Sequence, residues 1–233
     1  MPFDIPRGGD SPHIIRGVQS DYRRLYYSDH MAALRIPITM QAGHGVVQLG
    51  SAVTMNLSAS SVRRGRFLPY NPTVFVAASQ HAGRTRLTAA GAALANTVQV
   101  TIADSYKFAV LDDLIINDNV TAAENLGAIT AIDRTTDPNM ATITFTTPIG
   151  ATAFTVARLA YISVEAGVAN NFSDAVGILE RSVDTGEDQY AQGGHGTLIL
   201  GNCVLYDGCL WYMDAVARAA IGATLISQYM YIN

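Results

Sequence analysis

The sequence is poor in lysine, cysteine and tryptophan. Of the 15 basic residues in this 233-residue chain, Lys107 is the single lysine and the other 14 are arginine. The two cysteines, Cys203 and Cys209, stand six residues apart without a nearby histidine pair, so they predict neither a zinc site nor a disulfide framework. We expect both to be small apolar residues in or near the core of a protein from a reducing compartment.

Long apolar runs are also missing. The best candidate, residues 215–226, is interrupted by Arg218 and is shorter than the ~18 residues that a membrane-spanning helix needs. Residues 1–10 lack a basic region followed by an apolar one, so we expect no signal peptide. Hydrophobic residues make up 49% of the chain, which excludes disorder for most of it. We therefore expect a folded protein that does not bind a membrane.

The charge is distributed unevenly along the chain. Residues 1–86 hold ten arginines against four aspartates, a balance of +6, whereas residues 87–233 have a balance of −10. The net charge of the whole chain is −4. A protein that coats nucleic acid carries positive charge over its whole domain, so this distribution argues against a direct nucleic-acid partner.

Residues 1–33 predict an extended N-terminal arm. Three prolines and the pair Gly8-Gly9 disfavour a helix. Apolar residues do not recur at regular intervals in this segment, so it has little with which to form a core. A solvated tail is one interpretation, but the segment interleaves tyrosine with arginine, and both residue types are enriched at binding hot spots. We therefore favour an arm that becomes ordered on a partner. Its candidate contact residues are Arg7, Arg16, Tyr22, Arg23, Arg24, Tyr26 and Tyr27.

From residue 34 onward the sequence predicts a mainly β chain. Short alternating segments separated by glycine predict strands over residues 34–40, 46–49 and 52–57, and residues 67–72 predict a rigid loop with two prolines. The middle of the chain has a β pattern of its own, roughly six strands in about eighty residues, which is typical of a small barrel or sandwich. Its expected segments are residues 98–102, 108–111, 114–116, 128–132, 142–146, 152–156 and 160–164, with a hairpin connection over 133–139.

The last block, from about residue 170, combines strands with one helix. Asp214 stands at an N-cap position before a helix over residues 215–221, and Gly222 is expected to end that helix. Trp211 precedes the helix in an expected core region. The expected strands are residues 175–179, 197–200, 203–206 and 224–232, with turns at 184–188 and 192–196.

Patterns that could carry catalysis or bind a metal are weak. Asp184-Thr185-Gly186 matches the aspartic-protease triplet, but the charged Glu187 follows where that site needs a small residue. His44 and His195 lie in separate glycine-rich turns without spaced partners, so we expect no metal site. One acidic group lacks the ligand spacing of an EF-hand and predicts a surface loop instead. That group is Asp112, Asp113, Asp118 and Glu124. The sequence thus offers no credible catalytic centre or cofactor site, and we expect a protein that is not an enzyme.

The first and last β blocks together resemble the lambda-type phage head decoration proteins, a capsid-stabilising family. The front half of that family is similar to residues 39–53, Thr-Met-Gln-Ala-Gly-His-Gly-Val-Val-Gln-Leu-Gly-Ser-Ala-Val, and to residues 65–72, Gly-Arg-Phe-Leu-Pro-Tyr-Asn-Pro. In the family an Ala-Val-Gly-Ile-Leu strand follows directly, and here it stands at residues 175–179. Residues 196–204, the helix and the terminal strand resemble the family's ending. The intervening segment coincides with the middle β block, so we expect an inserted domain.

The resemblance and the β pattern together predict four parts. They are an extended arm over 1–33, the first part of a decoration-type β-domain over 34–78, an inserted β-barrel-like domain over 79–169, and the second part of the β-domain with a short helix over 170–233. In the family the arm adds backbone pairing to the capsid surface, a form of β-augmentation. Residues 1–33 are the candidate for that role here.

The resemblance implies a structural protein of the virion. It implies a homotrimer at three-fold positions of an expanded icosahedral head, which it stabilises against the pressure of packaged DNA. The implied partner is the major capsid protein, and the implied location is the outer capsid surface after assembly in the host cytoplasm.

Two other functions stay open at this point. One is a receptor- or glycan-binding β-protein of the virion surface, such as a head fibre or tail accessory, in which the middle domain binds the ligand. The other is a small β-barrel enzyme whose site is assembled only in an oligomer.

Overall fold

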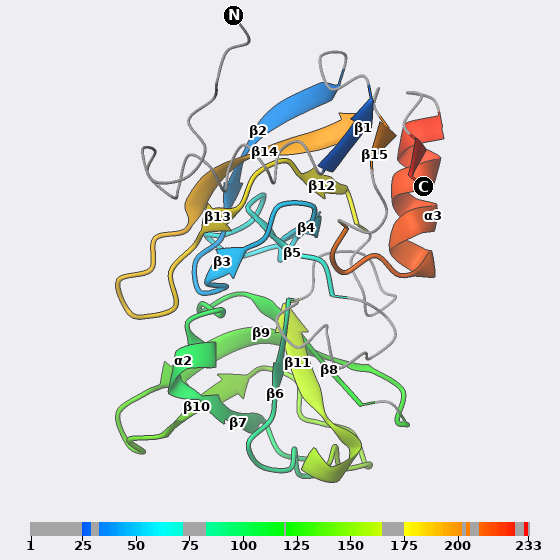
Figure 1. The fold of residues 1–233 in the computed structure, drawn as a ribbon. Coiled ribbons are helices and arrows are strands. Elements are labelled where there is room, and N and C mark those ends of the chain that lie inside the picture. The colour runs from blue at the N-terminus through cyan, green and yellow to red at the C-terminus, as the bar shows by residue number, and fades with distance from the viewer. Residues whose placement is uncertain are drawn as a thin grey trace, which may run out of the picture.

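The computed structural model describes residues 25–28, 33–71, 83–118, 120–164, 175–201, 204–205, 210–226 and 231–232. Strands dominate these residues, which confirms the prediction of a mainly β chain. Two β units carry most of the fold, a closed barrel and a six-stranded curled sheet, and they lie one against the other (Figure 1). Within this part of the chain, no helix is long and apolar enough to cross a membrane.

The barrel is built from segments far apart in the sequence. It consists of β2 (Leu34–Met40), β4 (Ala52–Met55), β5 (Phe67–Pro69), β12 (Gly177–Leu179) and β14 (Gly194–Gly201), in the spatial order β12-β14-β2-β5-β4. Its longest pairing joins β14 to β2 along their whole length. The short strands β3 (Val46–Val47) and β13 (Val183–Asp184) pair beside it. Residues before and after the curled sheet therefore share one hydrogen-bonded unit.

The curled sheet is formed by the strands between the two halves of the barrel. They are β6 (Arg84–Arg86), β7 (Thr97–Thr101), β8 (Asp113–Asn117), β9 (Glu124–Asp133), β10 (Met140–Phe145) and β11 (Tyr161–Val164), in the order β6-β11-β8-β9-β10-β7. The first and last strands of this order are consecutive in the chain, and the N–H of Thr88 donates to the carbonyl of Gln99 across them. The sheet thus curls until its two edges nearly meet.

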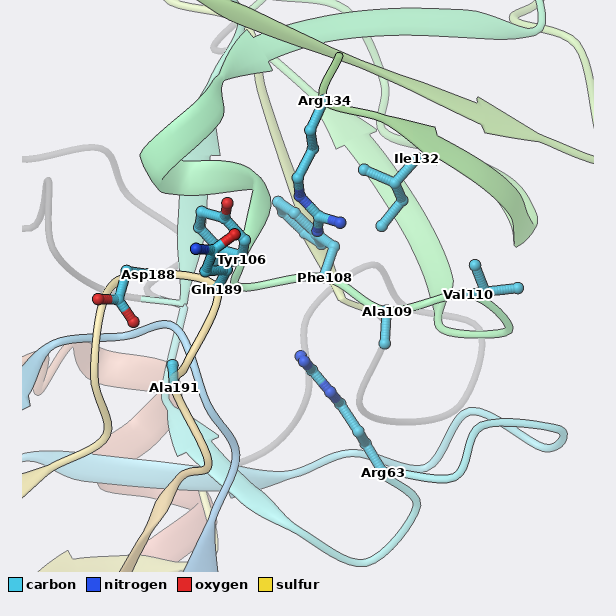
Figure 2. A pocket seen from close by; sticks show the side chains of 10 residues that line it. All are labelled: Arg63, Tyr106, Phe108, Ala109, Val110, Ile132, Arg134, Asp188, Gln189 and Ala191. Carbon is cyan, nitrogen blue, oxygen red and sulfur yellow. The ribbon is translucent and has the colours of Figure 1, made fainter.

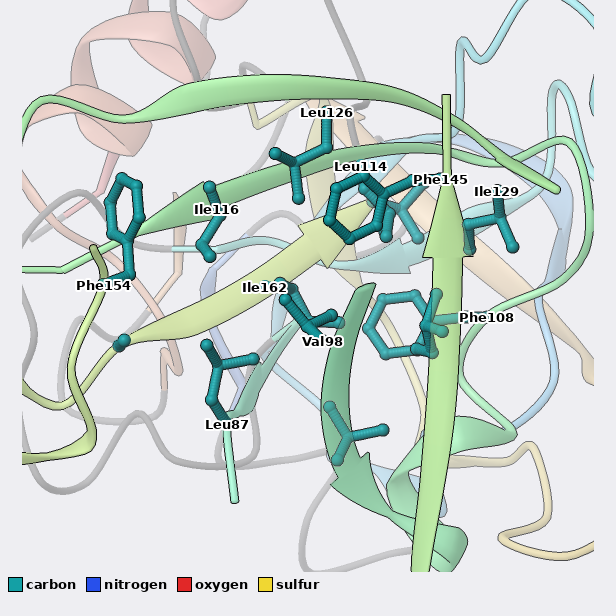
Figure 3. Close-up of a cluster of buried hydrophobic side chains, with 14 of the residues drawn as sticks. Leu87, Val98, Phe108, Leu114, Ile116, Leu126, Ile129, Phe145, Phe154 and Ile162 are labelled. Carbon is teal, nitrogen blue, oxygen red and sulfur yellow. The ribbon is translucent and has the colours of Figure 1, made fainter. Parts of the chain in front are cut away.

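Alternating apolar residues give the curled sheet its core. In β10, Ala141, Ile143 and Phe145 are buried while the residues between them are partly exposed, because successive side chains of a strand point to opposite faces. Three phenylalanines from different parts of the sheet meet aliphatic side chains there (Figure 3). Leu68 of β5 belongs to the same buried cluster. A barrel strand therefore extends this core across the contact between the units.

A third group of short elements lies beside the barrel. β1 (Tyr26–Ser28) pairs antiparallel with β15 (Val204–Leu205), which pairs in parallel with β16 (Tyr231–Ile232). The helix α3 (Ala215–Ile226) lies next to these strands in Figure 1. Two short helical segments, α2 (Ile102–Ser105) and η3 (Val156–Arg158), belong to the curled sheet. The predicted N-cap is confirmed, because an Asp214 carboxylate oxygen accepts from the N–H of Ala217 at 2.7 Å.

Several local predictions are wrong in this structure. The helix continues through Gly222 to Ile226, so the strand expected from residue 224 shrinks to β16. A single glycine inside a helix costs only about 1 kcal/mol relative to alanine, so Gly222 alone is not enough to end α3. Residues 67–69, expected as a loop, form β5, in which Pro69 lies at the end of the strand and removes no internal ladder bond. The turn expected at 192–196 is replaced from Gly194 onward by β14.

Two strands expected in the middle block are absent from the described residues. Residues 108–111 form a turn in which Leu111 adopts a positive φ of 72°, a conformation incompatible with an extended strand. Residues 152–156 contribute one isolated bridge, between Phe154 and Gly91, before η3 begins. Trp211 is 48% exposed rather than part of the core. The closed barrel is formed by the segments before and after the middle block. The middle block itself forms the six-stranded curled sheet, which is not a closed barrel.

Candidate functional site

The predicted arm residues lie mostly outside the described part of the chain. Arg7, Arg16, Tyr22, Arg23 and Arg24 are outside the described residues, so their role stays a prediction. Tyr26 and Tyr27 lie in β1, whose backbone pairs with β15.

Leu25 anchors the end of the predicted arm. Its side chain is fully buried in a cluster with Ile178 and Ile199 of the barrel and Ile221 of α3. The sequence prediction found little core-forming material before residue 34 and missed this residue. A single leucine among polar and aromatic neighbours gives no periodic signal, so only the fold reveals that it is core. The chain is therefore fixed to the body of the protein at Leu25 and β1.

Asp112 is the centre of a buried polar contact between the barrel and the curled sheet. Its carboxylate is fully buried. One oxygen accepts hydrogen bonds from Asn56 Nδ2 at 3.1 Å and from the hydroxyl of Ser61, both in the loop after β4. The other oxygen accepts from the N–H of Ala109 at 2.9 Å. Since buried polar groups are costly unless paired, this arrangement fixes one geometry for the two units.

A second set of hydrogen bonds extends this contact. The Asn56 amide also donates to Gln41 Oε1 at 3.2 Å, and Gln41 Nε2 donates to the Lys107 carbonyl at 3.1 Å. Gln41 Nε2 also lies 3.3 Å from His44 Nε2. Burial lowers the pKa of His44 well below its usual value, and the positive charges of Lys107 and Arg63 lower it further. His44 is therefore neutral in the fold, and its ring serves as part of this contact.

Gly43 lets the two units approach closely at the same place. It has a φ of +94°, and a Cβ built on it would lie 2.3 Å from the carbonyl oxygen of Tyr106. A side chain would thus strain the backbone and collide with the main chain of the other unit.

The acidic residues expected in a surface loop are mainly structural acceptors. Asp112 and Asp118 are buried, which corrects that prediction, and Asp118 accepts from the N–H groups of Val120 and Thr121. Glu124 accepts from the N–H of Gly150 at 2.7 Å. Each of these carboxylates accepts from donors in the fold, which are close in sequence for Asp118 but include distant ones for Asp112 and Glu124. No group of three or more metal-ligating side chains gathers among the described residues.

The Asp184-Thr185-Gly186 triplet locks a turn. Asp184 is exposed, and it accepts from the N–H of Gly186 at 2.9 Å. Thr185 is buried, and its hydroxyl donates to the Gly45 carbonyl at 2.8 Å and accepts from the His44 N–H at 3.0 Å. These contacts tie β13 to the turn before β3, a structural role for the triplet.

A cleft of about 370 Å³ opens where the two units meet (Figure 2). We call it the arginine cleft. Its lining residues are Arg63, Tyr106, Phe108, Ala109, Val110, Ile132, Arg134, Asp188, Gln189 and Ala191. Arg63 comes from the loop between β4 and β5, and Arg134 follows the end of β9, so each unit supplies one arginine. Figure 2 shows the two side chains directed toward one another across the opening.

Neutral partners hold both arginines in place. The Arg134 guanidinium donates from Nε to Ser105 Oγ at 2.7 Å and from Nη2 to the Ser105 carbonyl at 2.9 Å, and it stacks 4.6 Å from the centre of the Tyr106 ring. Arg63 Nη1 donates to the Lys107 carbonyl at 2.9 Å. Burial lowers the pKa of each arginine. The positive charge of Arg134 lowers the pKa of Arg63 further, whereas Asp112 raises it.

This cleft could not be predicted directly from the sequence. Arg63 and Arg134 are 71 positions apart in the sequence. Arg63 belongs to the predicted first part of the β-domain (34–78), and Arg134 belongs to the predicted inserted domain (79–169). The one available signal was the choice of arginine over lysine, which favours planar, bidentate recognition but does not say where the side chains meet.

Comparison with known proteins adds no relative. No protein-family model, no curated protein and no solved structure matches this chain.

Proposed function

We propose that this protein is a head decoration protein, which binds the expanded capsid of a phage as a homotrimer at three-fold positions and stabilises it against packaged DNA. The observation that carries the proposal is the composition of the barrel. β2, β4 and β5 come from the first β block, which contains the segments that resemble the front half of the decoration family, and β12 and β14 come from the last block, which contains those that resemble its back half. The two halves share one barrel although about a hundred residues separate them.

The attachment of the N-terminal segment supports a role for the preceding residues. Leu25 and β1 hold the chain on the body of the protein, so a partner held by residues 1–24 is linked to the barrel itself. In a trimer three such segments act together, and modest single contacts gain from the high effective concentration of the others. The partner in this proposal is the major capsid protein, on the outer surface of the virion. Assembly takes place in the host cytoplasm.

A truncation tests the proposal. Removal of residues 1–24 leaves Leu25 and β1 in place, so we expect a folded trimer that no longer sediments with expanded heads. The full chain is the positive control. Leu25→Ala is not a suitable substitute, because it removes a core residue rather than the segment. Undiminished binding of the truncated trimer to heads contradicts the arm as the capsid-binding element. No binding of the full chain to heads contradicts the proposed function itself.

A second candidate function is receptor or glycan binding on the virion surface. Trp211 favours it at a site outside the expected middle domain, because 48% of this residue is exposed, whereas the sequence predicted a core position. Exposed indole rings offer a large apolar face for stacking with a bound ligand. The backbone of Trp211 is fixed to the barrel by hydrogen bonds with Gly50 and Ala52. A change in Trp211 fluorescence on addition of host-surface glycans, lost in Trp211→Ala, supports this alternative; an unchanged spectrum excludes stacking on this ring.

A further inference from the structure

The arginine cleft contains two fixed cations that form no salt bridge among the described residues, and the charge of Arg63 is only partly compensated by the buried Asp112. The salt bridges formed by the described residues join Arg35 to Glu180 and Lys107 to Asp104, and neither involves Arg63 or Arg134. The hydrogen bonds of both cleft arginines go to carbonyl and hydroxyl oxygens. Two guanidinium groups that face one another repel, and their burial makes the repulsion stronger than in water.

Each guanidinium keeps donors available for a ligand. Arg134 uses Nε and Nη2 to bind Ser105, which leaves Nη1 without a described partner. Arg63 uses Nη1 to bind the Lys107 carbonyl, which leaves Nε and Nη2 without one. The stacking of Arg134 on Tyr106 and the anchoring of Arg63 reduce the entropy that either side chain loses when a ligand binds. The cleft is therefore organised for an anion before one arrives.

The walls beside the arginines are apolar. Phe108 and Ile132 line the cleft together with Val110, which is 46% exposed although its side chain is aliphatic. Figure 2 shows Val110 and Ile132 on one side of the two arginines and Asp188 on the other side. An apolar group next to an anionic one fits this distribution of charge and surface.

From this arrangement we propose that the arginine cleft binds the carboxylate of an acidic side chain on a peptide segment, with a neighbouring apolar side chain against Phe108, Val110 and Ile132. A carboxylate is planar and carries one charge, so it matches the fork of a guanidinium bidentately. A phosphate group carries up to two charges at neutral pH, so Asp188 in the same cleft repels it more strongly than it repels a singly charged carboxylate. The carboxylate is thus the better match. This inference does not depend on the capsid role proposed above.

The test is a titration of the full chain with two capped dipeptides, followed by nuclear magnetic resonance of backbone amides and arginine side chains. The acidic probe is acetyl-Leu-Glu-amide, and the isosteric control is acetyl-Leu-Gln-amide. We expect the acidic probe to bind with a Kd of about 1 mM and the neutral one to bind at least about tenfold more weakly. The shifted signals should belong to the residues that line the cleft.

Matched variants locate the interaction. Arg63→Gln and Arg134→Gln each should weaken binding of the acidic probe by about tenfold or more. Arg64→Gln is the control, since Arg64 is the next residue along the chain, is exposed and does not line the cleft. It removes the same charge and should leave the affinity unchanged.

Three outcomes overturn the proposal. They are equal affinity for the two dipeptides, signal shifts that lie away from the cleft, and tighter binding of inorganic phosphate than of the acidic dipeptide at the same residues. If Arg134→Gln unfolds because its stacking on Tyr106 is lost, Arg63→Gln and the comparison of the two dipeptides with the unmodified protein still decide the question.

Discussion

Replacement of Asp112 by alanine should weaken the contact between the barrel and the curled sheet. The carboxylate is fully buried and accepts from Asn56, Ser61 and Ala109. The Asn56 amide retains Gln41 Oε1 as an acceptor after the substitution, so two donors are left without a partner. An unsatisfied buried polar group costs roughly 1–3 kcal/mol, so two of them should lower the free energy of unfolding by about 2–6 kcal/mol.

The neighbouring aspartate provides the matched control. Asp113 is partly exposed, and its carboxylate accepts a single described hydrogen bond, from the N–H of Ala59 at 3.3 Å. Asp113→Ala should therefore lower the free energy of unfolding by at most about 1 kcal/mol. Both variants remove one negative charge from adjacent positions, so the difference between them isolates the buried contact.

Urea unfolding followed by circular dichroism measures this difference. Thermal unfolding provides a second readout: for a chain of this size, the expected loss for Asp112→Ala corresponds to a decrease in Tm of roughly 4–24 °C. A decrease no larger than that of Asp113→Ala would refute the conclusion that Asp112 fixes the two units together.

Three further substitutions test other parts of the fold. Gly43→Ala should lower the free energy of unfolding, measured in urea, by several kcal/mol more than Gly65→Ala does. Both glycines have a positive φ, but of the two only the Cβ at position 43 would meet main-chain atoms, those of Tyr106. Equal losses of free energy in the two variants would exclude the close approach at Gly43. His44 is neutral in the fold because burial lowers its pKa, whereas the unfolded chain binds a proton below about pH 6.5, so stability should fall as the pH decreases from that value by up to about 1.4 kcal/mol per unit. His44→Gln should remove that slope, which urea unfolding at about pH 7.5 and 5.5 detects, and an unchanged slope assigns it to other groups. Leu25→Ala should cost about 2–5 kcal/mol in the same assay, and a loss below about 1 kcal/mol contradicts its place in the core.

Local sequence patterns predicted the elements that depend on interactions between residues close in the chain. The alternation in residues 34–40 predicted β2 with its observed bounds, and Asp214 predicted the start of α3 because a cap depends on neighbouring N–H groups. The hairpin at 133–139 was also predicted correctly, and it joins β9 to β10 through an Asp133 carboxylate that accepts from Thr135 and Thr136. These hydrogen bonds lower the pKa of Asp133.

Features that depend on distant partners could not be predicted in this way. Leu25 is buried because Ile178 of β12, Ile199 of β14 and Ile221 of α3 meet it from three other segments, and no local period contains that information. Asp112 has the sequence neighbourhood of a loop, yet Asn56 and Ser61 from the other unit bury it. The arginine cleft likewise exists only because β9 and the loop after β4 meet, so its charge pattern is a property of the fold and not of a motif.

The proposed attachment of this protein to the three-fold positions of a capsid can be observed directly. Electron microscopy of expanded heads, prepared with and without the protein, measures this directly. We predict additional trimeric density above the three-fold positions, with a barrel-sized body close to the shell, and heads that release DNA more readily when the protein is absent. Heads whose maps are identical with and without the protein, or density attached to tails instead, would contradict the claim.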